Sequence, residues 1–409
     1  MTTTSRRPRL AYVTTHAIRA ENLMNGQLTS LRERGFDITV IAAPSESLDV
    51  VRERERVATI AISIEREISP VADVRTLAKL CRVFRTLRPD IVNAGTPKAG
   101  LLGMIAAKLT GVPVRLYTLR GLRLETTSGF KERLLSTTER VAASCAHQVI
   151  CVGDSLRQEF VRRRLVAADK TIVLRHGSSN GVNAERFQYS AEQFAQIDQL
   201  RTTLGIPADA PVIGFVGRLT RDKGIVDLHE AFTRLLTEFP DLRLLLIGWA
   251  EEGDPVPAAV WQSLQEHPQV LCTGAIKDPS LYYGLFDVFV FPSHREGFPN
   301  VPMEAAAAGI PVVGYSATGT LDAVVDGVTG TLVPLQDSAT LASAVAEYLR
   351  NPWQRHQHGE AGRRRALIDF RREDIWQSLA DLYGHWLSKR ELPLPNSSGE
   401  KTVPLRKTA

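Results

Sequence analysis

Short apolar runs alternate with amphipathic segments along almost the whole chain of 409 residues. In the first half, the runs that read as strands are RLAYVT, DITVIA, DIVNAG, VRLYTL, QVICV and TIVLR. Segments of helical periodicity lie between several of them, for example those that begin at Val71 and Lys98. Because alternating strands and helices are typical of a parallel sheet covered by helices, the pattern predicts an α/β fold built from βαβ units.

The alternation is interrupted once, after His176, by GSSNGVNAERFQYSAEQFAQ, which is rich in Ser, Asn and Gly. A second series then runs through PVIGFVG, LRLLLIG, VLCTG, DVFVFP and IPVVGY. The chain is also too long for one ordinary core. We therefore predict two doubly wound, Rossmann-like domains at residues 1–190 and 200–372. A helix over 373–388 is expected to pack back on the first domain, and residues 389–409, rich in Pro, Ser and Lys, are expected to form a disordered tail.

Composition narrows the class of protein. With 44% apolar, 23% charged and 7% aromatic residues, the chain has the composition of a soluble globular protein. Its apolar runs stop far short of the roughly 20 residues that a membrane-spanning helix needs, and the N-terminal segment does not read as a secretory signal. The four cysteines lack metal-type spacing, which suits buried thiols in a reducing compartment. We therefore predict a cytoplasmic protein.

Several nucleotide and metal signatures are missing from the sequence. Neither half has a G-x-G-x-x-G fingerprint after its first strand, which disfavours a nicotinamide or flavin dinucleotide. There is no Gly-x4-Gly-Lys-Ser/Thr loop, and no Asp-x-Asp pair that would hold a divalent ion against a nucleoside diphosphate. The sequence thus predicts neither a cofactor nor a metal site.

Charge is unevenly distributed. Residues 1–190 contain 30 Lys and Arg against 18 Asp and Glu, whereas the remainder contains 20 against 27. A basic front half suggests an anionic partner, and the alternative is a surface of solvated arginines. Nucleic acid is a poor candidate for that partner, because the basic half lacks interleaved aromatic residues and a recognisable binding module.

Two cations follow the first strand of the second series. In VIGFVGRLTRDKG, Arg218 comes directly after the strand and Lys223 lies five residues later, before a helix. Cations at the carboxyl end of a parallel strand, next to a helix N-terminus, suit a diphosphate and can stabilise the charge on a departing nucleoside diphosphate. Taken alone, the pair also fits an ordinary solvated loop.

Two acids, Glu296 and Glu304, lie eight positions apart in HREGFPNVPMEAAAAGIPVV. The first falls in the loop after the strand DVFVFPS, and the second lies one to two turns into the next helix. Backbone N–H groups at Gly297 and Phe298 can hold hydroxyl or phosphate oxygens at that helix entrance. Glu304 is suited to the two hydroxyls of a ribose, and Glu296 to a sugar hydroxyl or a developing cationic carbon. As an isolated pair, a helix cap and a solvated acid would explain them equally well.

GRLTRDKG, FPSHREGFPNVPMEAAAAGIPVV and DGVTGTLVP, in this order and at these intervals, closely resemble the donor half of the family 4 retaining glycosyltransferases of the GT-B fold. TPKAGLLG, VRLYTLRG and GSSNGVNAERF extend the resemblance, less specifically, over nearly the whole chain. The resemblance implies an acceptor domain first, a nucleotide-sugar domain second, and a reaction in the cleft between them. Glu296 and Glu304 match the two acids of the family's E-x7-E motif, and Arg218 and Lys223 match its diphosphate-binding Arg and Lys.

The resemblance further implies a metal-independent hexosyltransferase that uses a nucleoside diphosphate sugar, with a UDP-sugar, including a UDP-N-acetylhexosamine, as the expected donor. The donor's own phosphate is the expected proton acceptor, and a covalent route through Glu296 is the alternative. Donor contacts are expected from Glu304, from the segment Gly297, Phe298, Pro299 and Asn300, and from Gly26 and Arg120. Arg120 departs from the family, where a histidine often stands. Asn183 replaces a usual aspartate, which a turn tolerates.

Candidates for acceptor contact are His16, Asn25 and Lys98, at the starts of the loops and helices that follow strands of the first domain. TPKAGLLG and YTLRGLRLETTSG look most like members that build cell-surface polysaccharide on a polyprenyl diphosphate lipid. That acceptor, with peripheral contact to an anionic membrane, is therefore expected. A soluble small-molecule acceptor is the alternative, and a non-catalytic or epimerase-like sugar-nucleotide protein is the rival from another class.

Overall fold

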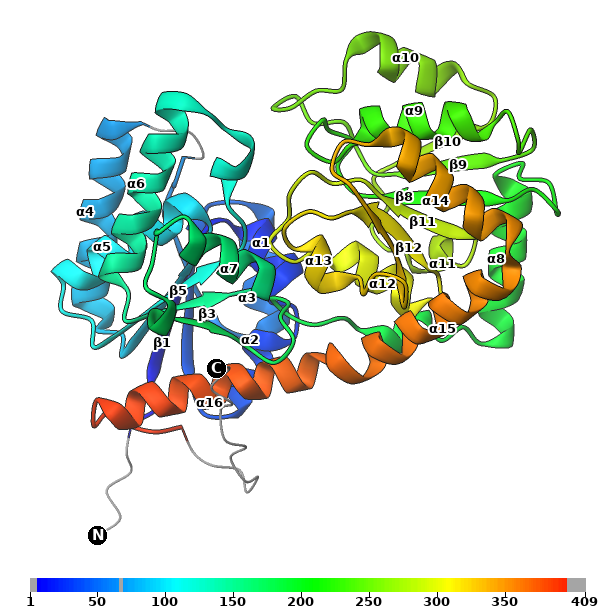
Figure 1. Ribbon diagram of the computed structural model, residues 1–409. Coiled ribbons are helices and arrows are strands. Elements are labelled where there is room, and N and C mark those ends of the chain that lie inside the picture. Colours follow the sequence, from blue (N-terminus) through cyan, green and yellow to red (C-terminus); the bar gives the residue numbers. More distant parts are fainter. Residues whose placement is uncertain (1–5, 66–68, 396–409) are drawn as a thin grey trace. The chain divides into compact units, whose positions relative to one another are not determined.

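The computed structural model describes residues 6–65 and 69–395 and divides into two compact units (Figure 1). One unit contains the chain up to Asn180 together with the segment from Arg372 onward, and the other contains Gly181–Arg371. The first domain was expected to end ten residues later. Residues 181–190 belong to the second unit because the Val182 N–H donates to the Phe370 carbonyl at 2.9 Å and Phe187 packs edge-on against Tyr283.

The C-terminal helix groups with the first unit, although the two are separated in sequence by the whole second unit. This helix, α16, spans Arg372–Lys389 and lies against α2 (Gln27–Glu33). Its Tyr383 is fully buried and meets the Phe36 ring edge-on. The predicted tail is described only as far as residue 395, and residues 396–409 lie outside the described part of the chain.

The sheet of the first unit has seven parallel strands in the order β3-β2-β1-β4-β5-β6-β7. The strands are β1 (Arg9–His16), β2 (Asp37–Ala43), β3 (Ala58–Ala61), β4 (Ile91–Gly95), β5 (Val114–Leu119), β6 (Gln148–Cys151) and β7 (Thr171–Val173). The other helices are α1 (Ala17–Leu23), α3 (Glu46–Glu55), α4 (Pro70–Leu87), α5 (Pro97–Leu109), α6 (Gly129–Cys145) and α7 (Asp154–Arg162). Within this unit α4, α5 and α6 lie side by side.

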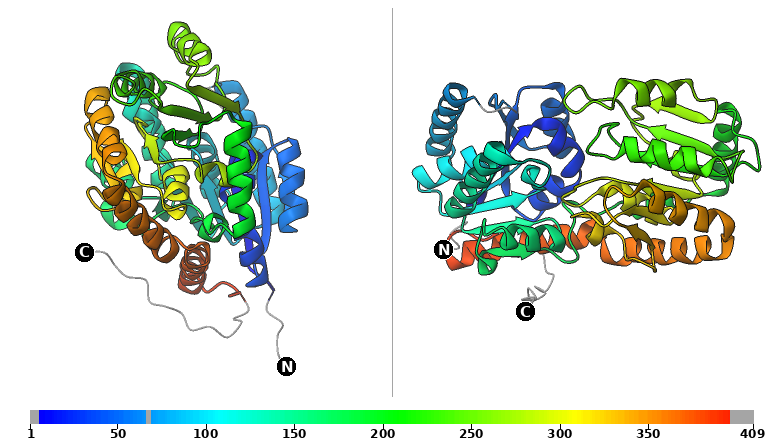
Figure 2. Two further views of the ribbon diagram at one scale, coloured as in Figure 1. Left: turned by 90° about the vertical axis from the view of Figure 1, so that its right-hand side faces the viewer. Right: turned by 45° about the horizontal axis from the view of Figure 1, so that its top comes forward.

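The second unit has a six-stranded parallel sheet in the order β10-β9-β8-β11-β12-β13. Its strands are β8 (Val212–Val216), β9 (Arg243–Ile247), β10 (Val270–Gly274), β11 (Val288–Phe291), β12 (Val312–Tyr315) and β13 (Gly330–Val333). Its helices are α8 (Ala191–Thr203), α9 (Ile225–Leu235), α10 (Ala258–Glu266), α11 (Ser280–Tyr283), α12 (Asn300–Ala307), α13 (Thr320–Ala323), α14 (Ser338–Arg350) and α15 (Pro352–Asp369). Helix α9 packs against α14, and α12 packs against α15 (Figure 2).

Periodicity explains which face each helix buries. In α9 the buried positions are Ile225, Leu228, Ala231, Phe232 and Leu235, a spacing that places them on one side of a helix. The inner strands β8 and β11 are buried at every position, as expected for a parallel sheet covered on both faces. The predicted fold class, two Rossmann-like α/β domains, is confirmed by this architecture.

Burial departs from the simple apolar pattern at two places. In α4 the Val74 side chain is 67% exposed, and the helix buries Thr76, Leu80, Cys81 and Phe84 instead. Of the four cysteines, Cys272 is exposed, because it lies on β10, the edge strand of its sheet. In the described part of the chain, no helix is both long enough and apolar enough to cross a membrane.

Strand order locates the functional edge of each unit. In the first sheet the order reverses between β1 and β4, and in the second between β8 and β11. In open parallel sheets of this kind, ligands bind at the carboxyl ends of the strands that flank such a reversal.

Candidate active site

The reversal in the second unit brings together two of the predicted residues. Lys223 follows β8 and Glu296 follows β11, and the Lys223 ammonium forms an ion pair with Oε1 of Glu296. The Ser293 hydroxyl donates to the same oxygen at 3.0 Å, and the Glu296 N–H donates to the Thr318 carbonyl at 3.0 Å. Both side chains of the pair are largely buried, with exposed fractions of 14% and 16%. The carboxylate is therefore held in one position at the edge of the sheet.

Arg218 lies at the same edge but has other partners. Its guanidinium pairs with Glu251, which follows β9, and its Nη2 lies 3.8 Å from Asp222. Burial alone would lower the pKa of Arg218, but the hydrogen bond to Glu251 and the charges of Asp222 and Glu251 raise that pKa above its usual value. The guanidinium is thus firmly protonated. Sequence reasoning missed Glu251, although the residues that follow LRLLLIG could have been examined by the same strand-end rule.

Two helix N-termini open onto this edge without side-chain caps. Helix α9 begins after Gly224 and α12 begins after Pro299. Gly224 has φ +71°, and a Cβ there would lie 2.0 Å from the Pro292 carbonyl oxygen, so only glycine fits. Uncapped N–H groups beside Arg218 and Lys223 are suited to an anion such as a diphosphate.

Glu304 lies on α12, one to two turns from the N-terminus. Its Oε2 accepts a hydrogen bond of 2.8 Å from the hydroxyl of Tyr283, a fully buried residue at the end of α11. Burial, with the neighbouring Glu304 charge, raises the pKa of Tyr283 well above its ordinary value, so the phenol stays a neutral donor. Tyr283 was not predicted, because nothing in the sequence near SLYYG marks its partner 21 residues later.

The segment before α12 is part of the core as well as of the edge. Gly297 and Pro299 are buried, and the Phe298 ring packs on Phe370 with centroids 5.2 Å apart. Asn300 is the first residue of α12. The donor contacts predicted for Gly297, Phe298 and Asn300 would use backbone N–H groups, whereas Pro299 has none and could contribute only its ring or its carbonyl. These contacts stay predictions.

At the reversal in the first unit, the predicted residues follow three neighbouring strands. His16 ends β1, Lys98 lies in the first turn of α5 after β4, and Arg120 directly follows β5. His16 is exposed, whereas Lys98 forms an ion pair of 2.7 Å with Asp73. Thr15 and Thr96, which sequence reasoning missed, share a hydrogen bond of 2.7 Å between the ends of β1 and β4.

Arg120 is the most deeply placed of these cations. Its Nη1 is buried with no hydrogen-bond partner among the described residues, and burial lowers its pKa to about 10, so it is still charged at neutral pH. Below it, the Tyr12 and Tyr383 hydroxyls are 2.6 Å apart, and Asn93 links Tyr383 to Thr118 through hydrogen bonds of 2.7 Å each. This buried polar chain fixes the ends of β1, β4 and β5 against α16.

Thr96 carries backbone strain at this edge. Its φ of +75° with ψ of 145° is a conformation that is essentially confined to glycine and costs about 1–3 kcal/mol for other residues. The Thr96 carbonyl accepts a hydrogen bond of 2.7 Å from the Gly100 N–H in the first turn of α5. This bond helps to hold Thr96, although it is β-branched, in the strained conformation. Such strain is concentrated at ligand sites in many proteins, which agrees with the strand-reversal rule.

Asn25 and Gly26 form the link between α1 and α2. The Asn25 carbonyl accepts from Asn180 Nδ2 at 3.0 Å, and the Gly26 N–H donates to Oε1 of the buried Glu55 at 3.0 Å. Gly26 has φ +79°, and a Cβ would lie 2.7 Å from the Trp376 ring. The glycine is thus required by the fold of the first unit, and its contact with the donor stays a prediction.

No group of three or more His, Cys, Asp or Glu residues suited to a metal ion occurs within residues 6–65 and 69–395. The edge of the second unit instead presents Arg218, Lys223 and the two helix N-termini as its positive groups. These can stabilise negative charge on a departing diphosphate.

Comparison with known proteins identifies the family. The family described as "Glycosyl transferases group 1" matches residues 196–365, and "Glycosyl transferase 4-like domain" matches residues 21–177. The chain is 35% identical over 369 residues to the capsular polysaccharide biosynthesis glycosyltransferase CapM of Staphylococcus aureus, covering 90% of this chain and 95% of CapM. The chain belongs to glycosyltransferase family 4, with the GT-B fold.

One further relative and one solved structure are also similar to this glycosyltransferase. It is 27% identical over 313 residues to the UDP-Gal:α-D-GlcNAc-diphosphoundecaprenol α-1,3-galactosyltransferase of Escherichia coli, covering 76% of this chain and 79% of that enzyme. The fold matches that of HepE of Anabaena in complex with UDP-glucose, with a TM-score of 0.77 and 22% identity over 92% of this chain and 99% of HepE. The predicted family and the predicted hexosyltransferase class are both confirmed.

Proposed function

We propose that this glycosyltransferase transfers a sugar, with retention of configuration, from a UDP-sugar to a hydroxyl group of a saccharide linked to a polyprenyl diphosphate. The donor part of this proposal rests on one observation. Lys223 and Glu296 lie together at the strand reversal of the second unit, beside the uncapped N-termini of α9 and α12. HepE, which shares the fold, was crystallised with UDP-glucose, and this supports a UDP-sugar.

The names of relatives support the lipid-linked acceptor. Besides the Escherichia coli enzyme, the N,N'-diacetylbacillosaminyl-diphospho-undecaprenol α-1,3-N-acetylgalactosaminyltransferase of Campylobacter jejuni is 23% identical over 329 residues. Both names describe sugars added in α linkage to saccharides on diphosphoundecaprenol. CapM, the relative with 35% identity, is named for capsular polysaccharide biosynthesis.

In the proposed reaction, the bond between the anomeric carbon and the diphosphate oxygen breaks, and the acceptor hydroxyl forms the new bond on the same face. The hydroxyl proton passes to the departing phosphate oxygen. Arg218, Lys223 and the N-terminus of α9 stabilise the charge that develops on the diphosphate. Glu296 orients the sugar and stabilises positive charge at the anomeric carbon, while Glu304 holds the ribose hydroxyls.

Arg218 and Lys223 each form an ion pair with a carboxylate, Arg218 with Glu251 and Lys223 with Glu296. A bound diphosphate would draw Lys223 and Arg218 toward itself, because it carries more negative charge than either Glu296 or Glu251. Release of Glu296 from Lys223 would then free its carboxylate for the sugar. Donor binding and the positioning of Glu296 are thereby coupled in this proposal.

The acceptor half of the proposal uses the first unit. Arg120, with its buried unpartnered Nη1, and Lys98 and His16 at the same edge are the proposed contacts for the anionic and hydroxyl groups at the reacting end. Peripheral membrane contact is proposed through the start of α4, where Val71 and Val74 are 65% and 67% exposed and Arg75 and Lys79 are exposed beside them. Each basic residue near an anionic surface contributes roughly 1 kcal/mol.

The experiment that tests the function is a donor screen monitored by nucleotide release. The purified protein is incubated with UDP-glucose, UDP-galactose and their N-acetylated forms, with and without an undecaprenyl diphosphate saccharide. Release that depends on the lipid acceptor supports the proposal. Release that needs only a soluble sugar or sugar phosphate would favour a soluble acceptor, an alternative for which the α-maltose-1-phosphate synthase of Mycobacterium tuberculosis, 30% identical over 316 residues, is the relevant relative.

A further inference from the structure

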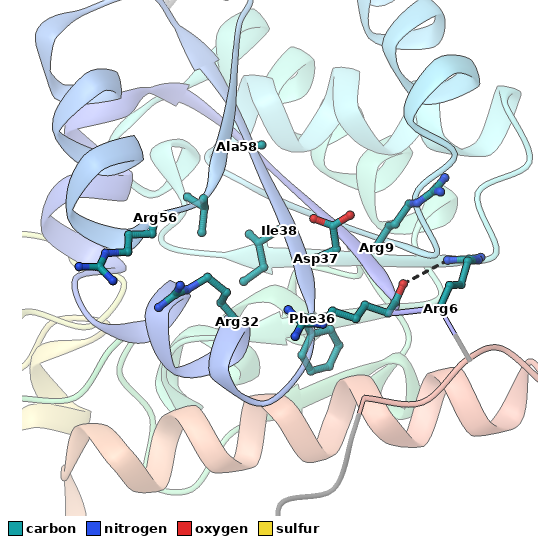
Figure 3. A pocket seen from close by; sticks show the side chains of 10 residues that line it. Arg6, Arg9, Arg32, Phe36, Asp37, Ile38, Arg56 and Ala58 are labelled. Atoms are coloured by element: carbon teal, nitrogen blue, oxygen red, sulfur yellow. Dashed lines mark hydrogen bonds between the residues drawn. The ribbon is translucent and has the colours of Figure 1, made fainter. Parts of the chain in front are cut away.

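A second basic site lies at the opposite edge of the first sheet. A cavity of about 360 Å³ opens at the amino ends of β1, β2 and β3, where Arg9, Asp37 and Ala58 are the first residues of the three strands (Figure 3). The ends of α2 and α3 complete it through Arg32 and Arg56. None of the residues assigned above to donor or acceptor lines this cavity.

The lining is strongly positive. Five arginines line it, and Asp37 is the one carboxylate among the lining residues; the arginines are Arg6, Arg7, Arg9, Arg32 and Arg56. In Figure 3, Arg32 and Arg56 lie on one side of Ile38, and Arg6 and Arg9 lie on the other. Guanidinium groups from three separate stretches of chain thus line one hollow.

Two of these arginines already have hydrogen-bond acceptors within the protein. Arg6 forms two hydrogen bonds of 2.7 Å with the carboxylate of Asp90, and Arg9 donates to the Leu87 carbonyl at 3.0 Å. Arg32 differs, because its Nε is buried with no hydrogen-bond partner among the described residues. Its Nη2 lies 3.5 Å from Glu33, whose side chain is 67% exposed. Within the described part of the chain, Arg56 has neither a hydrogen bond nor an ion pair.

Nearby negative charge does not balance the cavity. Asp37, Asp90 and the exposed Glu33 offset three of the five arginines. The C-terminal ends of α2 and α3 contribute roughly half a negative charge each. The carboxylate of Glu55, at the end of α3, is taken up by the N–H groups of Gly26 and Thr29 and by Arg54. About one positive charge therefore stays uncompensated, and the buried Nε of Arg32 without an acceptor is costly.

We propose that this cavity binds a phosphate-bearing anion, held chiefly by Arg32 and Arg56. Planar guanidinium groups match phosphate oxygens with two parallel hydrogen bonds, and the Nε of Arg32 would gain the acceptor that it lacks. Phe36, Ile38 and Val57, all buried, form an apolar base that strengthens the attraction by excluding water. The phosphate can belong to a soluble diphosphate or to a phospholipid head group, since the chemistry of recognition is the same.

The inference is independent of the proposed function, and its test does not use transferase activity. The protein is treated with phenylglyoxal, which modifies arginine, and modification at each arginine is followed by mass spectrometry. One arm adds inorganic pyrophosphate, and the other adds phosphatidylcholine vesicles with increasing phosphatidylglycerol. We expect protection of Arg32 and Arg56 in at least one arm. This readout is specific to the cavity, so pyrophosphate bound at Arg218 and Lys223 does not interfere with it.

Two double variants make the assignment. Arg32→Gln with Arg56→Gln is compared with Lys131→Gln with Arg133→Gln, which removes the same charge from exposed positions on α6 of the same unit. Both pairs are made in a Lys223→Ala parent, so that pyrophosphate bound at the donor edge does not mask the effect. The cavity variant should lose at least tenfold in affinity for whichever phosphate source gave protection, and the α6 variant should keep the affinity of the parent. Circular dichroism checks that both variants fold. Absence of protection at Arg32 and Arg56 in both arms would overturn the inference. The inference would also fall if the cavity variant bound the protecting phosphate source as tightly as its parent protein.

Discussion

Lys223 and Glu296 form an ion pair at the strand reversal of the second sheet, although 73 positions separate them in sequence. One follows β8 and the other follows β11, and these two strands are neighbours in the sheet. The pair thus joins the residue proposed to hold the diphosphate with the acid proposed to face the sugar. The two acids of the site differ in this respect, because Glu304 pairs with the hydroxyl of Tyr283 instead.

Because of this difference, Glu296→Gln and Glu304→Gln should fail in different ways. Glu296→Gln removes a charge needed mainly in the transition state, so kcat should fall about 10²- to 10³-fold. Glu304→Gln removes a ribose contact shared with the ground state, so the donor KM should rise with a smaller change in kcat. Steady-state kinetics with varied donor concentration measures both. The control is Glu266→Gln, which changes an exposed acid at the end of α10. Mild and equal effects in both variants would mean that these acids are only structural.

Tyr283→Phe tests whether Glu304 is positioned by its neighbour. Loss of the hydroxyl leaves the carboxylate without the hydrogen bond of 2.8 Å, and a hydrogen bond to a charged group is worth about 1.5–3 kcal/mol. We expect the donor KM to rise roughly tenfold with kcat little changed. In the Glu304→Gln background, the same substitution should add much less.

The matched control for that substitution is Tyr189→Phe. Tyr189 also packs near α11, but its hydroxyl donates to the Ser280 carbonyl at 2.7 Å rather than to Glu304. Its kinetic parameters should stay close to those of the wild type. Equal effects of the two substitutions on the donor KM would show that packing around α11, and not the hydrogen bond to Glu304, determines donor binding.

The sequence alone could predict which residues lie at the donor edge of the second sheet. The continuous apolar runs that became β8 and β11 are long enough to identify, and the rule that parallel strands end at one edge places Arg218, Lys223 and Glu296 there. Periodicity does not give strand order, so the sequence could not show that Lys223 meets Glu296 while Arg218 meets Glu251. The sequence did not identify β3 or β13, because each is a strand of only four residues at an edge of its sheet.

Activity should persist in excess chelator. The positive groups at the donor edge are Arg218, Lys223 and the N-termini of α9 and α12, and these stabilise a leaving diphosphate without an ion. The measurement is the transfer rate after dialysis against EDTA, compared with the rate after magnesium or manganese is restored. A rate that disappears in EDTA and returns with either ion would refute metal independence.

Glu139 provides a prediction for stability. It is buried on α6, and its Oε2 accepts from the Tyr117 hydroxyl at 2.8 Å, while burial raises its pKa to about 7. Between its unfolded pKa near 4.5 and about pH 7, the folded protein retains a proton that the unfolded chain has lost, so the free energy of unfolding falls as pH rises. Well above pH 7 the full cost of ionising the buried carboxyl is present, on the order of 3 kcal/mol.

Glu139→Gln keeps an acceptor for Tyr117 but cannot ionise. Relative to the wild type, it should gain stability as pH rises from 5 to 8, measured by urea unfolding at each pH. Glu132→Gln on the same helix removes an acid that pairs with Arg163 at 3.0 Å, and it should show no such gain. A difference between Glu139→Gln and the wild type that does not change with pH would show that Glu139 is ionised throughout this range in the folded protein.

Transfer of the sugar to a lipid-linked saccharide with retention of configuration can be measured by following a labelled sugar. The protein is incubated with a UDP-sugar labelled in the sugar and with an undecaprenyl diphosphate saccharide, and the lipid is then extracted and its new glycosidic bond is analysed by NMR. We predict labelled lipid with the anomeric configuration of the donor retained, and at least 10²-fold less of it with Lys223→Ala. Release of UDP with the label left in free sugar would show that the protein does not transfer the sugar to the lipid, and a product of inverted configuration would rule out a retaining mechanism.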